Sequence, residues 1–192
     1  MLSVSELRGR GPNETPMELH TDIAMPAPFP EYAMRVNCFW MLQDADLEGG
    51  ATAIIPGSHQ RLRNPSPPGD VLDPTKNSEA VPIEAKAGSL IVWHGAVWHG
   101  AFPRQKPGLR VALSIVYARP SMQVINDVRR LPREVIDRNP LRFSILTQQA
   151  SPFCGTDEES YTKQLINSFT LTGRYLEELG VTGAPDPNSQ IF

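Results

Sequence analysis

The 192-residue sequence predicts a mainly β fold, an all-β sandwich or barrel with helices added at its C-terminal end. Three observations support this fold class. Short apolar runs rich in β-branched and aromatic residues are separated by Gly, Pro, Asn and Asp turns. The 19 prolines favour strands and irregular loops over a helical bundle. After position 120, apolar residues are spaced at helical intervals with charged residues between them.

The predicted elements follow from this pattern of apolar runs and turn residues. The first fifteen residues are interpreted as a polar loop or arm. Residues 61–80 hold four prolines and few apolar groups, which predicts a long surface excursion. We treat 1–192 as a single domain with a β core over 16–120 and a helical extension over 121–192. The expected strands are 17–23, 32–43, 51–55, 81–85, 89–94 and 109–117, and the expected helices lie within 131–149 and 158–179.

Composition excludes several classes of partner. A net charge of −3 and a pI near 5.8 give no electrostatic footprint for nucleic acid or an anionic membrane, so we expect a small-molecule partner. No apolar run approaches the roughly 18 residues of a membrane span, and the N-terminus lacks the apolar core of a signal peptide. The two cysteines, Cys38 and Cys154, form no CxxC pair, which indicates neither a disulfide framework nor a thiolate zinc site. We therefore expect a cytoplasmic protein.

The stretch from Gly88 to Arg119 carries much of the expected chemistry. It predicts two buried strands that flank a loop holding His94 and His99. Arg110 enters the second strand, where a guanidinium must be paired or must face a polar cavity.

A second stretch, Glu18 to Asp22, adds two more polar groups. Successive side chains of a strand alternate between its faces, so His20 and Asp22 point the same way and Thr21 points the opposite way. If His99 joins them, two imidazoles and one carboxylate form the set that suits non-haem Fe(II), with open positions for substrate and O₂. Arg110 facing the same cavity would offer a planar fork to a carboxylate-bearing cosubstrate.

Two alternatives concern single residues. His20 and Asp22 by themselves are more typical of a surface strand than of a metal site. His94 could replace His99 as the third ligand, although a role beside the ligands or in the core fits its place at the end of an apolar strand better.

Three motifs in order resemble a known family. They are HTD at 20–22, NCFWMLQDADLEGGATAIIPGSH at 37–59 and WHGAFPRQKPGLRVAL at 98–113. Together they resemble the phytanoyl-CoA dioxygenase-like family of Fe(II)- and 2-oxoglutarate-dependent oxygenases, which includes ectoine hydroxylase. The resemblance covers roughly residues 20–120 and implies a double-stranded β-helix, the cupin-like jelly roll.

The resemblance also implies the site residues. His20, Asp22 and His99 would bind Fe(II), and Arg110 would bind the distal carboxylate of 2-oxoglutarate. The remaining candidates for the cosubstrate pocket are Trp40, at a position where the family often has an aromatic residue, and Asn37, which shares a face with Trp40 only if the strand is irregular between them. Related halogenases lack the carboxylate ligand, so Asp22 favours hydroxylation.

The chain departs from the family pattern in two places. The family often has a hydroxyl residue two positions beyond the distal histidine, and this chain has Ala101. Family members also carry a longer segment ahead of the HxD motif, which implies that this chain is a fragment or a reduced form. A barrel that lacks strands exposes sheet edges and an apolar face, so we expect homo-oligomers.

The resulting functional expectation is a dioxygenase that uses Fe(II), 2-oxoglutarate and O₂ to hydroxylate an aliphatic C–H of a small molecule. One alternative is a non-catalytic jelly-roll remnant that binds metal or a partner. Another is a cupin-like isomerase or sugar-binding module, which would leave Arg110 without a role.

Overall fold

The structure, a computed structural model, describes residues 1–119, 121–122, 124–126, 128, 130–149 and 158–180. The chain divides into two compact units. The first is formed by residues 3–122, and the second by residues 1–2 together with 123–192. Within the described residues the first unit contains the strands, and the second contains the α-helices.

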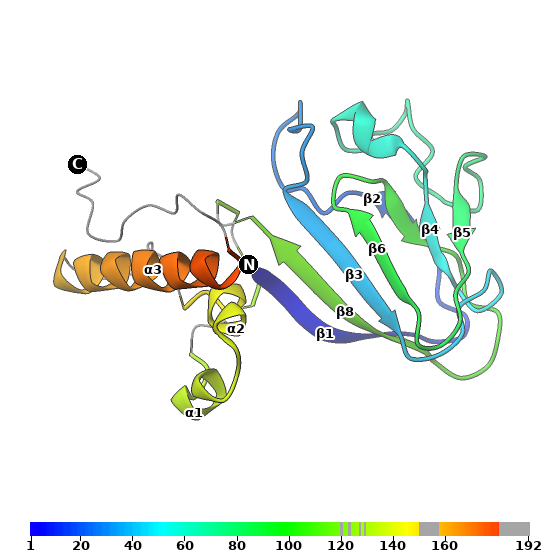
Figure 1. The fold of residues 1–192 in the computed structure, drawn as a ribbon. Helices are drawn as coiled ribbons and strands as arrows, with labels where there is room; N and C mark the ends of the chain where they lie inside the picture. The colour runs from blue at the N-terminus through cyan, green and yellow to red at the C-terminus, as the bar shows by residue number, and fades with distance from the viewer. Residues whose placement is uncertain (120, 123, 127, 129, 150–157, 181–192) are drawn as a thin grey trace. The chain divides into compact units, whose positions relative to one another are not determined.

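The first unit is built from two four-stranded sheets that face each other (Figure 1). One has the strand order β1-β8-β3-β6 and the other β2-β7-β4-β5. The pairs β2–β7, β3–β6, β3–β8, β4–β5 and β4–β7 are antiparallel. The mainly β fold class with C-terminal helices is therefore confirmed. The strands are β1 (Leu2–Arg10), β2 (Met17–His20), β3 (Arg35–Met41), β4 (Thr52–Ile54), β5 (Val81–Ile83), β6 (Leu90–His94), β7 (His99–Ala101) and β8 (Arg110–Ala118).

The expectation of a loop over residues 1–15 is wrong, because residues 2–10 form β1 at the edge of its sheet. The strand is polar, with Glu6 and Arg8 in its middle. Backbone N–H and C=O groups make the hydrogen bonds of a sheet, so an edge strand needs no apolar run. Charged side chains on an edge strand also oppose pairing with another chain.

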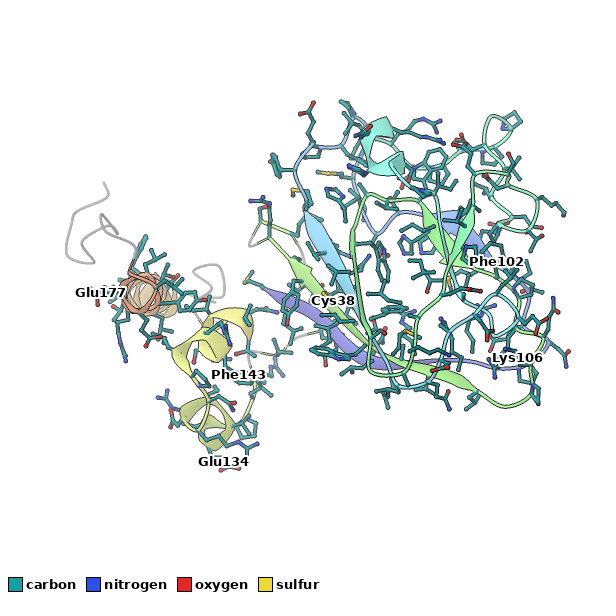
Figure 2. The ribbon with its side chains drawn as sticks, turned by 45° about the vertical axis from the view of Figure 1, so that its right-hand side comes forward. Cys38, Phe102, Lys106, Glu134, Phe143 and Glu177 are labelled. Carbon is teal, nitrogen blue, oxygen red and sulfur yellow. The ribbon has the colours of Figure 1, made fainter. Side chains whose placement is uncertain are left out.

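The excursion over 61–80 is confirmed as a long connection without strands. It follows a short 3-10 helix, η1 (Ser58–Arg61), and is fixed at several points to the outer face of the β2-β7-β4-β5 sheet. Leu19 N donates to Leu72 O over 2.8 Å, and Trp98 Nε1 donates to Arg63 O over 2.9 Å. Beneath it lies a buried apolar cluster, with Phe102 marked in Figure 2. Its members are Leu19, Ala53, Ile55, Trp98 and Phe102.

The outer face of the other sheet is apolar and exposed. Trp40 on β3 and Leu90 and Val92 on β6 have exposed fractions of 45%, 46% and 54%. Cys38, on the same strand face as Trp40, is partly exposed (Figure 2). The prediction of a buried strand over residues 89–94 is therefore wrong for one face of the strand, because the side chains of β6 alternate between interior and solvent.

The second unit contains α1 (Arg133–Asp137), α2 (Leu141–Leu146) and α3 (Glu158–Glu178), and α2 contacts α3. The two predicted helical regions are thus confirmed. Pro132 and Pro140 precede α1 and α2, and proline is favoured where a helix begins because its fixed φ is compatible with the first turn. Cys154 lies outside the described residues. Among the helices that are described, none has the length and apolar character needed to cross a membrane.

Candidate metal centre

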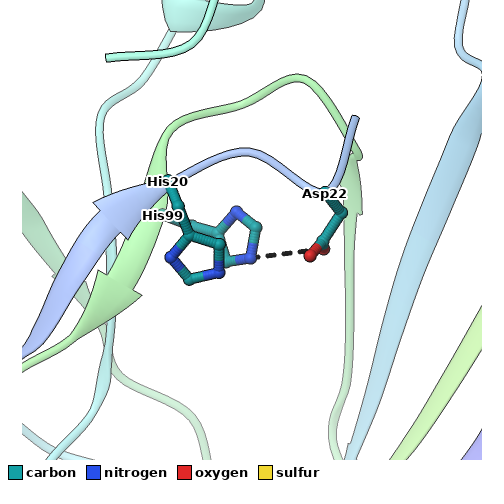
Figure 3. A group of neighbouring side chains, drawn as sticks. All are labelled: His20, Asp22 and His99. Carbon is teal, nitrogen blue, oxygen red and sulfur yellow. Dashed lines mark ion pairs between the residues drawn. The ribbon is translucent and has the colours of Figure 1, made fainter. Parts of the chain in front are cut away.

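Three of the predicted residues meet at one place between the sheets. His20 is the last residue of β2, His99 is the first residue of β7, and the two residues are paired across these strands. Asp22 lies two positions beyond the end of β2, where its backbone N–H donates to Gly95 O over 3.0 Å. The possible ligand atoms of the three side chains all lie within 4.8 Å of one another (Figure 3).

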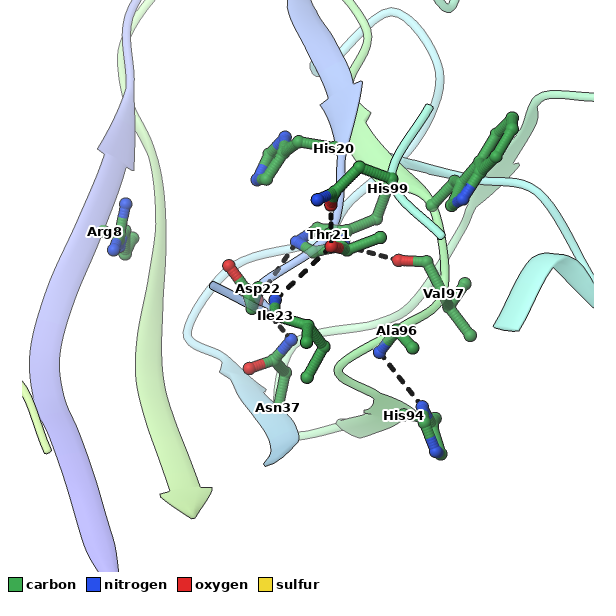
Figure 4. A network of polar contacts seen from close by, with 12 residues as sticks. Arg8, His20, Thr21, Asp22, Ile23, Asn37, His94, Ala96, Val97 and His99 are labelled. Atoms are coloured by element: carbon green, nitrogen blue, oxygen red, sulfur yellow. Dashed lines mark hydrogen bonds and ion pairs between the residues drawn. The ribbon is translucent and has the colours of Figure 1, made fainter. Parts of the chain in front are cut away.

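This placement differs from the sequence prediction in two details. His99 belongs to a strand and not to the loop that was expected, and Asp22 follows its strand and is not part of it. His20 and Asp22 nevertheless converge as predicted. Thr21 points the opposite way, and its hydroxyl donates to Asn64 Oδ1 in the excursion (Figure 4).

Gly100 explains why β2 and β7 can lie so close at this point. A β-carbon placed on Gly100 would lie 2.3 Å from Met17 O, a distance that real structures do not show. Only glycine, which has no side chain, allows this approach of two backbones. The residue after His99 therefore helps to bring the two imidazoles together, with ring centroids 4.4 Å apart.

Each imidazole is oriented by a backbone carbonyl. His20 Nδ1 lies 2.8 Å from Glu18 O, and His99 Nδ1 lies 2.9 Å from Val97 O. A carbonyl oxygen can only accept, so each Nδ1 carries the proton and each Nε2 keeps its lone pair in the neutral ring. Both histidines thus have the tautomer in which Nε2 can bind a metal.

The carboxylate is held by Asn37, whose Nδ2 donates to Asp22 Oδ2 over 2.5 Å (Figure 4). Asn37 has an exposed fraction of 1%, and its Oδ1 has no hydrogen-bond partner. The same Asp22 Oδ2 lies 3.3 Å from His99 Nε2. Asn37 therefore positions one ligand and leaves a buried acceptor beside the cluster.

The surroundings favour the protonation states that metal binding needs. Burial lowers the pKa of His20, and the nearby His99 lowers it further. Burial alone would raise the pKa of Asp22, but its contacts with His99 and Asn37 outweigh burial, so this pKa is lowered. Both shifts favour the deprotonated side chains that bind metal ions.

Arg110 lies in the first position of β8 with an exposed fraction of 4%. Its Nε and Nη1 are buried and have no hydrogen-bond partner. Burial, followed by the nearby Arg10 and Arg104, lowers the pKa of Arg110 to about 10. A buried cation with unpaired donors is strongly unfavourable, so this position suits an anionic ligand.

The structure does not bring Trp40 to the cluster. The pairing of β3 with β6 and β8 is continuous through this region, so Asn37 and Trp40 face opposite sides of the sheet. Asn37 faces the interior, whereas Trp40 is 45% exposed on the outer face. The predicted contact between Trp40 and a cosubstrate is therefore not supported.

His94 also lies apart from the three ligand residues. Its Nδ1 accepts a hydrogen bond from Ala96 N over 3.0 Å, and its ring lies 5.3 Å from the ring of His59. Within the described part of the chain, the group that could hold a metal consists of His20, Asp22 and His99. The alternative with His94 as third ligand has no geometric support.

Trp93 lies beside the cluster, although no sequence motif singles it out. Its ring meets the ring of His99 edge-on, with centroids 5.4 Å apart, and its buried Nε1 has no acceptor. A buried indole N–H usually has a partner. Strand alternation could have placed Trp93 near the site. Trp93 on β6 pairs with Asn37 on β3, so both side chains lie on the interior face of the sheet.

The residues present fit an iron and keto-acid site. Two imidazole nitrogens and a carboxylate on one side of a central point are the ligand set of non-haem Fe(II) oxygenases. The unpaired buried donors of Arg110 and Trp93 fit a carboxylate-bearing ligand in the same interior.

The fold and the site define a jelly-roll protein with a two-histidine, one-carboxylate centre. A profile of the family described as phytanoyl-CoA dioxygenase matches residues 7–112, which is more than half of the chain. The chain belongs to this family. The resemblance found in the sequence motifs is thereby confirmed.

Relatives from bacteria, fungi and plants share this region. The chain is 33% identical over 112 residues to an uncharacterised protein of Mycobacterium tuberculosis, covering 58% of this chain and 39% of that protein. It is 33% identical over 128 residues to dioxygenase af480 of Aspergillus fumigatus, covering 65% and 40%. It is 34% identical over 91 residues to phytanoyl-CoA dioxygenase 1 of Oryza sativa, covering 40% and 30%. The matches thus span about 40% or less of the relatives' length.

Solved structures agree on the fold. HygX from Streptomyces hygroscopicus, determined with nickel and 2-oxoglutarate bound, superposes with a TM-score of 0.54 at 15% sequence identity. The match covers 65% of this chain and 58% of HygX. The iron-bound form of HygX gives a TM-score of 0.51. This likeness supports the jelly-roll architecture.

Proposed function

We propose that this protein binds Fe(II) through His20, Asp22 and His99 and uses 2-oxoglutarate and O₂ to hydroxylate an aliphatic C–H of a small molecule. The observation that carries the proposal is the ligand geometry. The three side chains converge within 4.8 Å, and the backbone carbonyls occupy the Nδ1 atoms, so that both Nε2 atoms keep a lone pair for a metal. Asp22 in the third ligand position supports hydroxylation over halogenation.

The chain's own residues have distinct parts in this reaction. His20, Asp22 and His99 would hold the metal, Asn37 would keep Asp22 oriented, and Arg110 would bind the far carboxylate of the keto acid. Bound Fe(II) and 2-oxoglutarate would supply oxidising power, because decarboxylation of the keto acid to succinate provides electrons for the reduction of O₂.

Aromatic rings pack on one side of the candidate ligands, which supports such chemistry. Trp93 and Phe39 pack against each other with ring centroids 4.9 Å apart, and Trp93 packs against His99. Exclusion of water strengthens the electrostatic contacts of a bound ligand and suppresses side reactions.

The test is 2-oxoglutarate turnover. Protein loaded anaerobically with Fe(II) is mixed with ascorbate, 2-oxoglutarate and air, and succinate is measured with and without candidate substrates. We expect slow substrate-free turnover that disappears in His20→Ala and Asp22→Ala. His59→Ala is the matched control, since it removes an imidazole outside the ligand set and should keep the activity.

Full turnover in either ligand variant would refute the ligand assignment. Normal metal content with no succinate, in the wild type and with every substrate tried, would favour the second function, a metal-binding module without catalysis. The observation behind this second function is that the matches span only about 40% of the relatives' length, so parts of those proteins have no counterpart in the matched region.

A further inference from the structure

Arg10 and Arg110 lie next to each other on neighbouring strands. β1 and β8 are hydrogen-bonded neighbours, and they run in opposite directions (Figure 1). A β-carbon placed on Gly11 would lie 3.7 Å from Leu109 Cδ2, so the chain just beyond β1 lies close to the chain just before β8. Arg10 is the last residue of β1 and Arg110 is the first residue of β8, and the charge of Arg10 acts on Arg110. The two guanidiniums are therefore near each other.

Both guanidiniums are buried and incompletely paired. Arg10 is 6% exposed and Arg110 is 4% exposed. Arg10 Nη2 donates to Thr15 O over 2.8 Å, but its Nε is buried without a partner, as are Nε and Nη1 of Arg110. Like charges that lie near each other repel, and buried unpaired donors add to this unfavourable energy.

The neighbouring groups do not neutralise this pair. Arg104 adds a third buried cation, and its nitrogens are already paired with the backbone oxygens of Gly49, Pro107 and Gly108. Glu14 is the acid that acts on Arg110, and its Oε2 lies 3.6 Å from Arg10 Nη1. Among the described residues, two incompletely paired guanidiniums therefore lie near one partly exposed carboxylate.

We propose that Arg10 and Arg110 together bind the far carboxylate of a dicarboxylic keto acid. This inference rests on the proposed function and adds a second cosubstrate-binding residue to it. The two guanidiniums offer three buried nitrogen atoms without partners, and the two oxygens of one carboxylate would accept hydrogen bonds from them. Family members often have a hydroxyl residue that contacts the cosubstrate two positions beyond the distal histidine, and this chain has Ala101 there. Donors from Arg10 would replace that contact.

The test compares two ligands that chelate metal in the same way. 2-Oxoglutarate and pyruvate share the 2-oxo acid end, and pyruvate lacks the far carboxylate. Binding of each to Zn(II)-loaded protein is measured by calorimetry, so no turnover is required. We expect Arg10→Gln and Arg110→Gln to weaken 2-oxoglutarate binding by about tenfold or more, as loss of a charge-assisted hydrogen bond does, and to leave pyruvate binding unchanged.

Two further variants separate this role from others. Arg8→Gln removes a charge from the same face of β1 two residues earlier, and it should change neither affinity. A loss in Arg8→Gln equal to that in Arg10→Gln would show general attraction of anions and would overturn the inference. Arg10→Lys keeps the charge without the planar fork, so it should give a smaller loss confined to 2-oxoglutarate. This variant also serves if Arg10→Gln fails to fold.

The outcomes separate failure of the Arg10 inference from failure of the proposed function. If Arg110→Gln weakens 2-oxoglutarate alone while Arg10→Gln weakens both ligands equally, Arg10 only secures the chain at Thr15, and the inference fails while the proposed function stands. If the wild type binds zinc but neither ligand, the proposed function itself fails.

Discussion

Asn37 Nδ2 lies 2.5 Å from Asp22 Oδ2, and this hydrogen bond connects the two sheets at the candidate metal centre. Asn37 comes from β3 of one sheet, and Asp22 follows β2 of the other. A carboxylate that is fixed in this way binds metal without first losing rotational freedom. The position of one ligand therefore depends on the packing of both sheets.

Replacement of Asn37 should weaken metal binding. We expect Asn37→Ala to lower the affinity for Zn(II) by about 10–100-fold, because Asp22 loses the donor that orients it. Competition with a chelator measures this affinity. Cys38→Ala, on the opposite face of the same strand, is the control and should bind metal like the wild type. Equal affinities in all three proteins would show that Asn37 does not orient the ligand.

Trp93 should report metal binding through its fluorescence. Its ring lies 5.4 Å from that of His99, whereas Trp40 is exposed on the outer face. A paramagnetic ion such as Ni(II) bound by His99 should quench Trp93. We expect Trp93→Phe to lose most of the metal-dependent quenching and Trp40→Phe to retain it. Quenching that survives in Trp93→Phe would place the ion elsewhere.

A methyl group at position 100 should separate β2 from β7. Gly100→Ala places a β-carbon 2.3 Å from Met17 O, so the strands must move apart, and the protein should lose about 1–3 kcal/mol of stability along with metal binding. Gly9→Ala on β1 is the matched control, because nothing lies within 4 Å of its β-carbon. Chemical denaturation measures both variants. A stable, metal-binding Gly100→Ala would disprove the close approach.

The metal-free protein should become less stable as the pH falls below about 6.5, the ordinary pKa of an imidazole. Burial lowers the pKa of both His20 and His94, with smaller effects from His99 and His59 respectively. The unfolded chain therefore takes up protons that the folded chain does not, and acid favours unfolding in this range. Asp22, whose pKa is also lowered, should add a further loss below about pH 4.

Thermal unfolding between about pH 8 and pH 5.5 measures this dependence. We expect His94→Gln, which cannot titrate there, to have a shallower decline in melting temperature than the wild type. An unchanged slope would show that His94 keeps an ordinary pKa.

The exposed apolar face of the β1-β8-β3-β6 sheet should lead to self-association. Apolar patches of this kind commonly bind other surfaces, and Val92 lies on the edge strand β6 with an exposed fraction of 54%. Sedimentation should show dimers or larger species in the wild type and a shift to monomer in Val92→Lys. Val71→Lys, at an exposed position in the excursion, should not shift. A monomeric wild type would contradict this prediction.

Much of the site could be predicted because its chemistry depends on residue types in a fixed order. The sequence motifs group His20, Asp22 and His99, and the structure brings the three side chains together. Strand periodicity predicts that Asn37 and Trp40 share a face only if the strand is irregular between them. The pairing of β3 with its neighbours is regular, so the two side chains lie on opposite faces.

The missed features depend on contacts between distant parts of the chain. β1 is paired through backbone atoms, which every residue but proline carries in full, so its polar sequence gave no sign of a strand. Trp93 belongs to the site because its ring contacts that of His99, and Arg10 because its charge acts on Arg110. Both contacts join distant parts of the chain. Sequence spacing does not give this register.

Trp98 couples the surface of the protein to its interior. Its backbone N–H donates to Ser58 Oγ, its indole donates to Arg63 O, and the next residue in the chain is His99. The guanidiniums of Arg61 and Arg63 lie 4.4 Å and 4.9 Å from its ring centroid. Within the same loop Asp70 holds Arg63, Glu79 holds Arg61 and Leu72 is bonded to β2, so a change in loop length should be felt at the imidazole of residue 99.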